Sequence, residues 1–171
     1  MKEQLERLLE MLERAEGDLE NRPLFMVVLD LVLTSGLVTR QMLADELETA
    51  PSTVERMRNG TANPHIAVHH SVYRFLKEKA EAKITLLQRF GPLIKTIERA
   101  GQDLEDDVLF NESMGQAFKL ELFDVLEAAR ELKISLPTVN RWCMGQSAPH
   151  PLGRLSVMHW LMGKVESRLK Q

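Results

Sequence analysis

Apolar residues recur along most of the chain at the three- and four-residue spacing of amphipathic α-helices. In the first segment this spacing predicts a helix over residues 2–20. Its apolar positions are Leu5, Leu8, Leu9, Leu12, Ala15 and Leu19. The alternation of apolar and polar residues that marks a half-buried strand does not persist anywhere in the sequence. The pattern therefore predicts an all-α fold.

Four more helices are expected in the first half of the chain. Thr39 is a suitable N-cap for the second of them, Ser52 and Thr53 for the third, and Gly60 suits a left-handed end to that third helix. Pro23 suits a first helical turn, and Gly91-Pro92 is expected to interrupt the last helix. The expected segments are residues 23–35, 39–47, 52–60 and 64–90.

The second half repeats this scheme and predicts five helices of its own. They are expected over residues 92–101, 105–119, 121–132, 136–143 and 151–169.

The two halves are related by an internal repeat. Residues 53–65 reappear as residues 138–150, with a Thr-Val pair, an arginine, a glycine and a Pro-His pair at equal spacing. Pro64 and Pro149 lie 85 residues apart, and this register holds without a gap over the whole chain. Roughly a quarter of the aligned positions are identical, which indicates a duplicated module. The repeat predicts two domains, residues 1–85 and 86–171, and the absence of a Gly/Ser linker favours a helical or tightly packed junction.

Composition places the chain among ordinary soluble globular proteins. It is 44% hydrophobic and 27% charged, and its longest apolar stretch, residues 24–29, is too short to span a bilayer. The polar start, residues 1–4, differs from a secretory signal. The single cysteine, Cys143, excludes an internal disulfide framework. These features predict a cytoplasmic protein that does not interact with membranes.

Charge is distributed unevenly between the halves. The net charge of −3 argues mildly against a nucleic-acid binder, and acidic residues collect in residues 3–20. Residues 130–170 carry seven basic and two acidic residues, whereas the matching residues 45–85 carry six of each. Attraction to phosphate is therefore expected to be stronger in the second half.

The best-conserved part of the repeat carries a recurrent set of apolar and small residues. In the first half these are Leu43, Ala44, Leu47 and Val54, followed by Arg56 and Gly60; in the second they are Ala129, Leu132, Val139 and Trp142. This arrangement resembles the phage-repressor-like (Cro/repressor-type) helix-turn-helix family over about 45 residues of each half. The resemblance implies two similar five-helix modules, each with a lambda-repressor-like helix-turn-helix whose second helix enters the major groove of DNA.

The resemblance also implies which residues contact DNA. Base-reading positions would be Pro51, Ser52, Glu55 and Arg56 in the first half, and Leu136, Pro137, Asn140 and Arg141 in the second. Phosphate contacts would come from Arg40, Thr53, Asn63, Thr138 and Ser147. Each arginine suits a bidentate contact with guanine, and Asn140 suits adenine.

Three features keep an alternative open, in which both motifs are retained only as packing units; the last two are departures from the family pattern. Glu55 would repel phosphate in the first half. Where the family often has a phosphate-binding glutamine, the chain has Arg40 and Val125, of which only the arginine can substitute. Three implied reading positions offer no side-chain hydrogen bond to a base, namely Pro51, Leu136 and Pro137.

Other candidate sites have simpler interpretations. His65 and His69 lie one helical turn apart, but no cysteine or carboxylate at a suitable spacing completes a metal site, and we expect no metal or cofactor. Cys143 has no evident base beside it and is interpreted as a structural thiol. The leucine-rich helix 2–20 is expected to cover the core of its own domain, with a homodimer or protein partner on this face left open.

The sequence therefore predicts a non-enzymatic protein that binds double-stranded DNA in a sequence-specific manner and regulates transcription. A tandem duplication would place two reading helices on one chain, as a pseudo-dimer. The alternative is a protein–protein interaction adaptor, antitoxin-like or regulator-sequestering, that uses the same fold without binding DNA.

Overall fold

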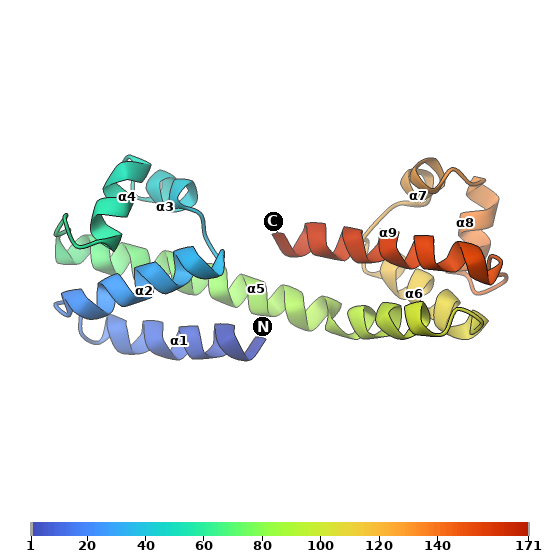
Figure 1. Cartoon of the computed structure of the whole chain (residues 1–171), viewed down its shortest axis with the longest axis horizontal. Helices are drawn as coiled ribbons and strands as arrows, with labels where there is room; N and C mark the ends of the chain where they lie inside the picture. The colour runs from blue at the N-terminus through green and yellow to red at the C-terminus, as the bar shows by residue number, and fades with distance from the viewer. Residues whose placement is uncertain (1, 171) are drawn as a thin grey trace. The chain divides into compact units, whose positions relative to one another are not determined.

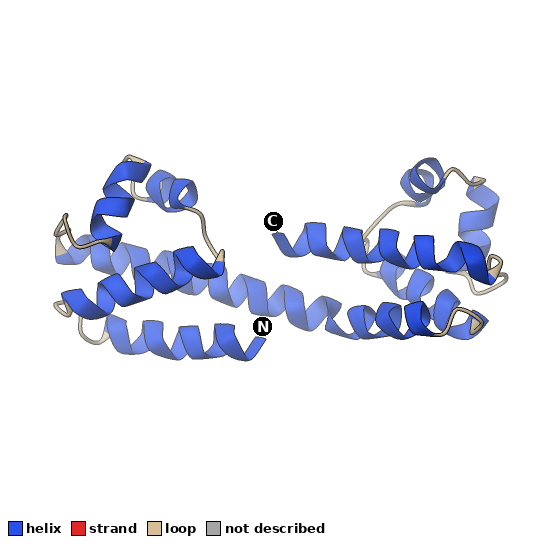
Figure 2. Cartoon of the chain, viewed as in Figure 1, coloured by secondary structure: helices blue, strands red, loops and turns tan. Residues whose placement is uncertain are grey.

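The computed structural model describes residues 2–170, and every regular element in this range is an α-helix (Figures 1 and 2). The helices are α1 (Lys2–Glu16), α2 (Arg22–Ser35), α3 (Arg40–Glu46), α4 (Pro51–Arg58), α5 (Ile66–Gln102), α6 (Asp107–Lys119), α7 (Val125–Leu132), α8 (Leu136–Cys143) and α9 (Pro151–Lys170). The predicted all-α fold is confirmed. Among the described residues, no helix is both long and apolar enough to cross a membrane.

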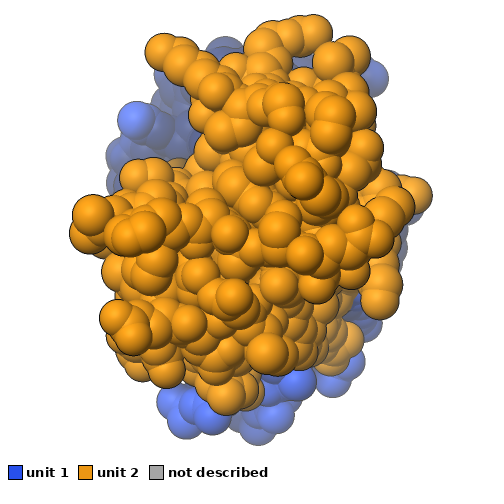
Figure 3. Space-filling view, turned by 90° about the vertical axis from the view of Figure 1, so that its right-hand side faces the viewer, with its two compact units in different colours: residues 1–85 blue, residues 86–171 orange. Residues whose placement is uncertain are grey.

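The chain divides into two compact units, coloured separately in Figure 3. Unit 1 comprises Met1–Thr85 and unit 2 comprises Leu86–Gln171. Each unit has its own apolar core, and α5 contributes its first part to unit 1 and its last part to unit 2. Because each core is closed within one unit, the hydrophobic free energy that stabilises each half comes from its own residues.

The core of unit 1 is built from one face of each helix. From α1 it takes Leu8, Leu12 and Ala15, all of which are buried. The leucine-rich face of residues 2–20 is thus used within its own unit, which supports the intramolecular interpretation of that helix. The remaining buried residues come mainly from α2 and α5, together with Leu43 and Val54 of the short helices between them.

Backbone conformation repeats between the two units. Every residue with a positive φ among the described residues belongs to a pair 85 positions apart. The pairs are Gly36 and Glu121, Glu48 and Lys133, and Gly60 and Gly145. Gly60 has φ 75°, the left-handed conformation expected at the end of α4. Because left-handed residues mark the turns between helices, the two units make their turns at the same places.

One buried polar contact also recurs. His69 of α5 is buried, its Nδ1 lies 2.8 Å from the carbonyl oxygen of Leu19, and its ring stacks on Phe25. In unit 2, Arg154 of α9 stands at the corresponding place and donates over 2.8 Å to the carbonyl oxygen of Leu104. The first contact joins α5 to the turn before α2, and the second joins α9 to the turn before α6.

The guanidinium of Arg154 makes further contacts that the imidazole of His69 lacks. It donates to the Pro149 carbonyl oxygen over 2.7 Å, forms an ion pair with Asp107, and lies over the Phe110 ring. Buried charges require such partners, because an unpaired charge removed from water is strongly destabilising.

The expected break at Gly91-Pro92 is wrong, since α5 runs through both residues. Proline in a helix interior costs about 3 kcal/mol, because it lacks an N–H and crowds the preceding turn. Phe90 and Leu93, on either side of the proline, are buried in the core of unit 2. Their burial outweighs the local penalty and keeps the segment helical.

Two other predicted helices are shorter than expected. The first ends at Glu16 rather than near residue 20, and residues 17–20 form the turn that carries the Leu19 carbonyl. The helix expected over residues 121–132 begins at Val125, because Glu121 is left-handed and Asp124 caps the helix.

Candidate nucleic-acid interface

In unit 1 the implied reading helix is α4, which packs against α3 and α2 (Figure 1). Thr39 caps α3 by accepting a hydrogen bond from the Met42 N–H over 3.1 Å, as predicted. The turn between the helices passes through left-handed Glu48 and closes with a bond from the Thr49 N–H to the Ala44 carbonyl oxygen over 2.9 Å. We call α3 and α4 the first helix pair.

Unit 2 builds the second helix pair, α7 and α8, by the same local rules. Asp124 caps α7 by accepting from the Glu127 N–H over 2.7 Å. The turn passes through left-handed Lys133, and the Ile134 N–H donates to the Ala129 carbonyl oxygen over 3.1 Å. The buried residues on the inner side of this pair are Ala128, Ala129, Val139 and Trp142.

The second helices of the two pairs, α4 and α8, differ at their N-cap residues. In α8, Ser135 is the N-cap and its hydroxyl accepts from the Thr138 N–H. In α4 the N-cap is Ala50, which has no side-chain acceptor. The predicted capping by Ser52 and Thr53 is wrong, because Pro51 already lies in the first turn and places both residues inside the helix.

The implied contact residues of unit 1 lie mainly on the outer side of the first helix pair and its following loop. Pro51, Ser52, Arg56 and Asn63 are exposed, and Thr53 and Glu55 are half-buried. Among residues 2–170, the Arg56 side chain makes no ion pair or hydrogen bond. Its guanidinium is thus free to meet a ligand in solution.

Glu55 is not an isolated negative charge. It pairs with Arg40 over 3.3 Å and with Arg58 over 3.8 Å. Arg58 in turn binds Asp30 of α2, with nitrogen–oxygen distances of 2.6 and 2.8 Å. The hydrogen bond to Asp30 raises the pKa of Arg58 further above its usual value. We call these four residues the unit 1 charge network.

This network changes the sequence interpretation in two ways. Arg40, expected to contact phosphate, also forms an ion pair with Glu55. Glu55 in turn is compensated by two cations, Arg40 and Arg58. Asp30 and Arg58 are not among the contact residues predicted from the sequence. Asp30 is exposed and its partner lies 28 residues further along the chain, so no local pattern signals this contact.

Unit 2 has no counterpart of the network. The positions 85 residues after Asp30, Arg40, Glu55 and Arg58 hold Gly115, Val125, Asn140 and Cys143. In place of the Arg58–Asp30 pair there is a surface groove of 530 Å³, whose lining includes Gly115, Cys143 and the exposed side chains of Val108 and Met144.

The implied contact residues of unit 2 are arranged around a reading helix without acidic residues. Leu136, Pro137 and Arg141 are exposed, and Asn140 is half-buried. Within the described part of the chain, Arg141 makes no side-chain ion pair or hydrogen bond. Thr138 and Ser147, which the resemblance assigns to phosphate contacts in this unit, are half-buried. The Thr138 hydroxyl lies 2.7 Å from that of Ser135, so the cap already uses part of its hydrogen-bonding capacity.

Part of the positive charge of unit 2 is internally neutralised. Arg154 is buried against Asp107, and Lys164 pairs with both Glu127 and Glu131. Hydrogen bonds from Lys164 and from Trp160 lower the pKa of Glu131 below its usual range. The positive balance counted from sequence therefore overstates the charge available to phosphate.

His65, His150 and Cys143 are engaged in local packing and hydrogen bonding within the chain. The Nδ1 atoms of His65 and His150 accept from backbone N–H groups two residues on, over 3.2 and 3.4 Å, at the starts of α5 and α9. Burial raises the pKa of Cys143 to about 11, so that the thiol is protonated near neutral pH. Residues 2–170 contain no group of three metal-ligating side chains placed to hold an ion.

Comparison of the chain with models of protein families, with curated proteins and with solved structures finds no match.

Proposed function

We propose that the protein binds double-stranded DNA in a sequence-specific manner and regulates transcription, with α4 and α8 as the reading helices of two helix-turn-helix motifs. The observation that carries the proposal is the exposed, unpaired arginine at the same place on each helix, Arg56 and Arg141. A guanidinium in this position suits a bidentate contact with guanine in the major groove.

Repetition of the surrounding structure supports the proposal. Both helix pairs have a capped first helix, a left-handed turn residue and a second helix ended by a left-handed glycine. Such a tight turn holds the second helix at a defined angle to the first, as groove recognition requires. The internal repeat places two reading helices on one chain, so we expect a bipartite and only partly palindromic site.

The two units are expected to contribute unequally. In unit 2 the reading helix presents Asn140 and Arg141 without an acidic neighbour on the helix, whereas in unit 1 Arg56 stands beside Glu55. A carboxylate on a DNA-facing surface opposes phosphate, even when partly compensated. We therefore expect unit 2 to supply the larger share of specific affinity.

Selection from a random duplex library by the full chain, followed by titration of the selected sequence at several salt concentrations, tests the proposal. Arg141→Ala should weaken binding by about 1–3 kcal/mol and relax one base position. Lys95→Ala is the matched control, because Lys95 is an exposed cation of the same unit that lies on α5. Equal losses in both variants, or no salt-dependent duplex binding, would contradict specific recognition through α8.

A protein-binding adaptor is the second candidate, and one observation favours it. In unit 2, Val108 and Met144 are 73% and 70% exposed and line the same groove. Large exposed apolar side chains that share a groove are typical of protein-interaction surfaces. A stoichiometric protein partner whose binding is abolished by Met144→Lys, with no duplex retained by the wild-type chain, would favour the adaptor over the DNA-binding protein.

A further inference from the structure

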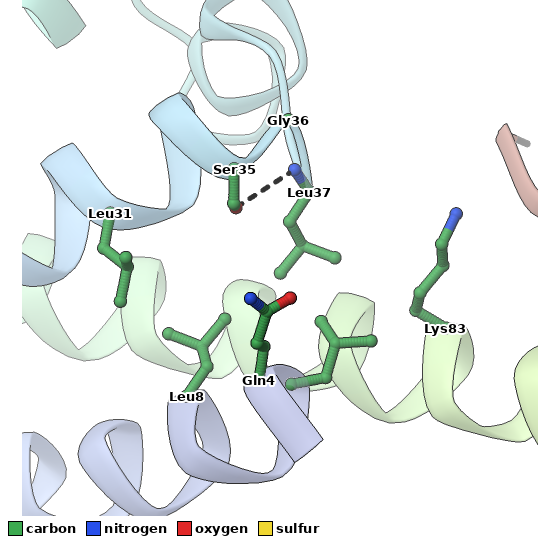
Figure 4. A pocket seen from close by; sticks show the side chains of 8 residues that line it. Gln4, Leu8, Leu31, Ser35, Gly36, Leu37 and Lys83 are labelled. Atoms are coloured by element: carbon green, nitrogen blue, oxygen red, sulfur yellow. Dashed lines mark hydrogen bonds between the residues drawn. The ribbon is translucent and has the colours of Figure 1, made fainter. Parts of the chain in front are cut away.

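A pocket of 280 Å³ opens in unit 1 between α1, the end of α2 and α5 (Figure 4). Half of the lining residues are leucines, namely Leu5, Leu8, Leu31 and Leu37. In Figure 4 Leu8 of α1, Leu31 of α2 and Leu37 of the loop after α2 lie around the pocket, and Lys83 of α5 stands to one side of them. The pocket therefore combines an apolar wall with one cation.

Lys83 has no internal partner for its charge. Among residues 2–170 its ammonium makes no ion pair or hydrogen bond, and no acidic residue lies three or four positions away on α5. Partial burial lowers the pKa of Lys83, so its ammonium is less well hydrated than one in open solvent. An anion beside it would restore favourable interactions to that charge.

The other polar groups of the pocket do not supply this anion. Ser35 Oγ donates to the Val32 carbonyl oxygen over 3.0 Å and lies 3.4 Å from the Leu37 nitrogen, so it is satisfied locally. The Gln4 amide is neutral and makes no hydrogen bond among the described residues. Lysine is thus the one charged residue in the lining.

The corresponding place in unit 2 provides an internal comparison. A pocket of 210 Å³ is lined there by Arg89, Phe90, Leu120, Glu121 and Arg168, which lie 85 residues after Gln4, Leu5, Ser35, Gly36 and Lys83. Arg89 donates to the Leu120 carbonyl oxygen over 3.2 Å, and Arg168 to the Glu121 carbonyl oxygen over 3.5 Å. Each of these unit 2 arginines thus has one backbone acceptor within the chain, whereas the Lys83 ammonium has no acceptor among residues 2–170.

We propose that the unit 1 pocket binds a small carboxylic acid with an apolar body, such as a medium-chain fatty acid. The carboxylate pairs with the Lys83 ammonium, and the hydrocarbon chain lies against Leu5, Leu8, Leu31 and Leu37. Pockets of this type derive affinity from apolar burial and orientation from a single polar group. Each buried methylene contributes about fourfold in affinity, so the bound acid gains strength with chain length until the pocket is full.

Titration of the isotope-labelled full chain with sodium octanoate, below its micelle concentration and followed by amide chemical shifts, tests the site. We expect saturable shifts confined to the linings of α1, α2 and the Gly36–Leu37 loop, and at Lys83. Octylammonium should not bind, because its charge repels the lysine, and n-octanol should bind at least about tenfold more weakly. Equal binding of the three probes, or shifts spread over the chain, would overturn the proposal.

Lys83→Met removes the charge and keeps the apolar stem, and should weaken octanoate binding by about tenfold or more. Arg168→Met is the matched control at the corresponding position of unit 2 and should leave octanoate affinity unchanged. A second variant, Leu31→Gln, introduces the residue found at the corresponding position of unit 2, Gln116, and should weaken binding through the apolar wall. Unchanged affinity in Lys83→Met, or equal loss in Arg168→Met, contradicts a carboxylate held by Lys83.

Discussion

His69 in unit 1 and Arg154 in unit 2 occupy corresponding positions, and each reaches the carbonyl oxygen of a leucine 50 residues earlier in the chain. The arginine also pairs with Asp107, whereas the position corresponding to Asp107 in unit 1 is Arg22. A buried arginine beside a second arginine would be strongly unfavourable. The two copies therefore changed as sets of partners rather than residue by residue.

The exposed side of the helix pairs shows the same behaviour. In unit 1 three ion pairs join the four residues of the charge network in a chain, and unit 2 has none of the four. Glu55, whose carboxylate would oppose a phosphate, is present together with the arginines that compensate it. The charges of the two units therefore have to be compared together with their partners, because a charge acts through what surrounds it.

The largest expected effect is on stability at the buried position. Arg154→Met leaves two carbonyl groups without a donor and should lower the free energy of unfolding of unit 2 by about 2–4 kcal/mol. Both tryptophans, Trp142 and Trp160, belong to unit 2, so tryptophan fluorescence during urea unfolding follows this unit selectively. The exposed Arg168→Met serves as control, and equal stability of the two variants would contradict a structural role for the guanidinium.

Transplanting the arginine into unit 1 sharpens the comparison. His69→Arg should destabilise unit 1 by about 2–3 kcal/mol, because Arg22 rather than an aspartate stands at the pairing position. Adding Arg22→Asp in the same chain should recover part of the loss. Urea unfolding followed by far-UV circular dichroism measures the stability of the single and the double variant. Unchanged stability in His69→Arg, or no recovery when Arg22→Asp is added, would show that the residues at positions 69 and 22 act independently.

The second transplant tests the reading helices. Asn140→Glu places on α8 the carboxylate that α4 carries, without the arginines that compensate it in unit 1. Duplex affinity should fall about tenfold, or ~1.4 kcal/mol. Asn140→Gln controls for the loss of the native amide geometry. If Asn140→Glu binds duplex as tightly as Asn140→Gln, α8 does not form part of the DNA-binding surface.

The smallest expected effect concerns the helix starts. Ser135→Ala removes the cap of α8 and should cost about 1 kcal/mol, whereas Ala50→Ser supplies the missing cap of α4 and should add up to about 1 kcal/mol. Hydrogen exchange at the first amides of each helix measures the two changes separately. Protection that fails to rise in Ala50→Ser would mean that Pro51 alone governs the start of α4.

Much of the local structure was predictable from residues close together in the chain. The bounds of α8 agree with the predicted residues 136–143, and Thr39 and Gly60 perform the capping roles expected of them. Such features depend on one side chain and the few backbone groups within its reach. The exposed arginines at residues 56 and 141 follow from the same reasoning, since helical periodicity determines which face is apolar.

Contacts between distant residues were not predictable in this way. The pairing of Asp30 with Arg58, the burial of Arg154 and the passage of α5 through Pro92 all depend on neighbours brought close by folding. The internal repeat, the all-helical fold and caps such as Thr39 were determined by the sequence itself, because they depend on the order of residues or on groups within one or two helical turns. Which charges are paired, buried or free was decided only by the tertiary structure, because Coulomb and desolvation energies depend on distance in space rather than along the chain.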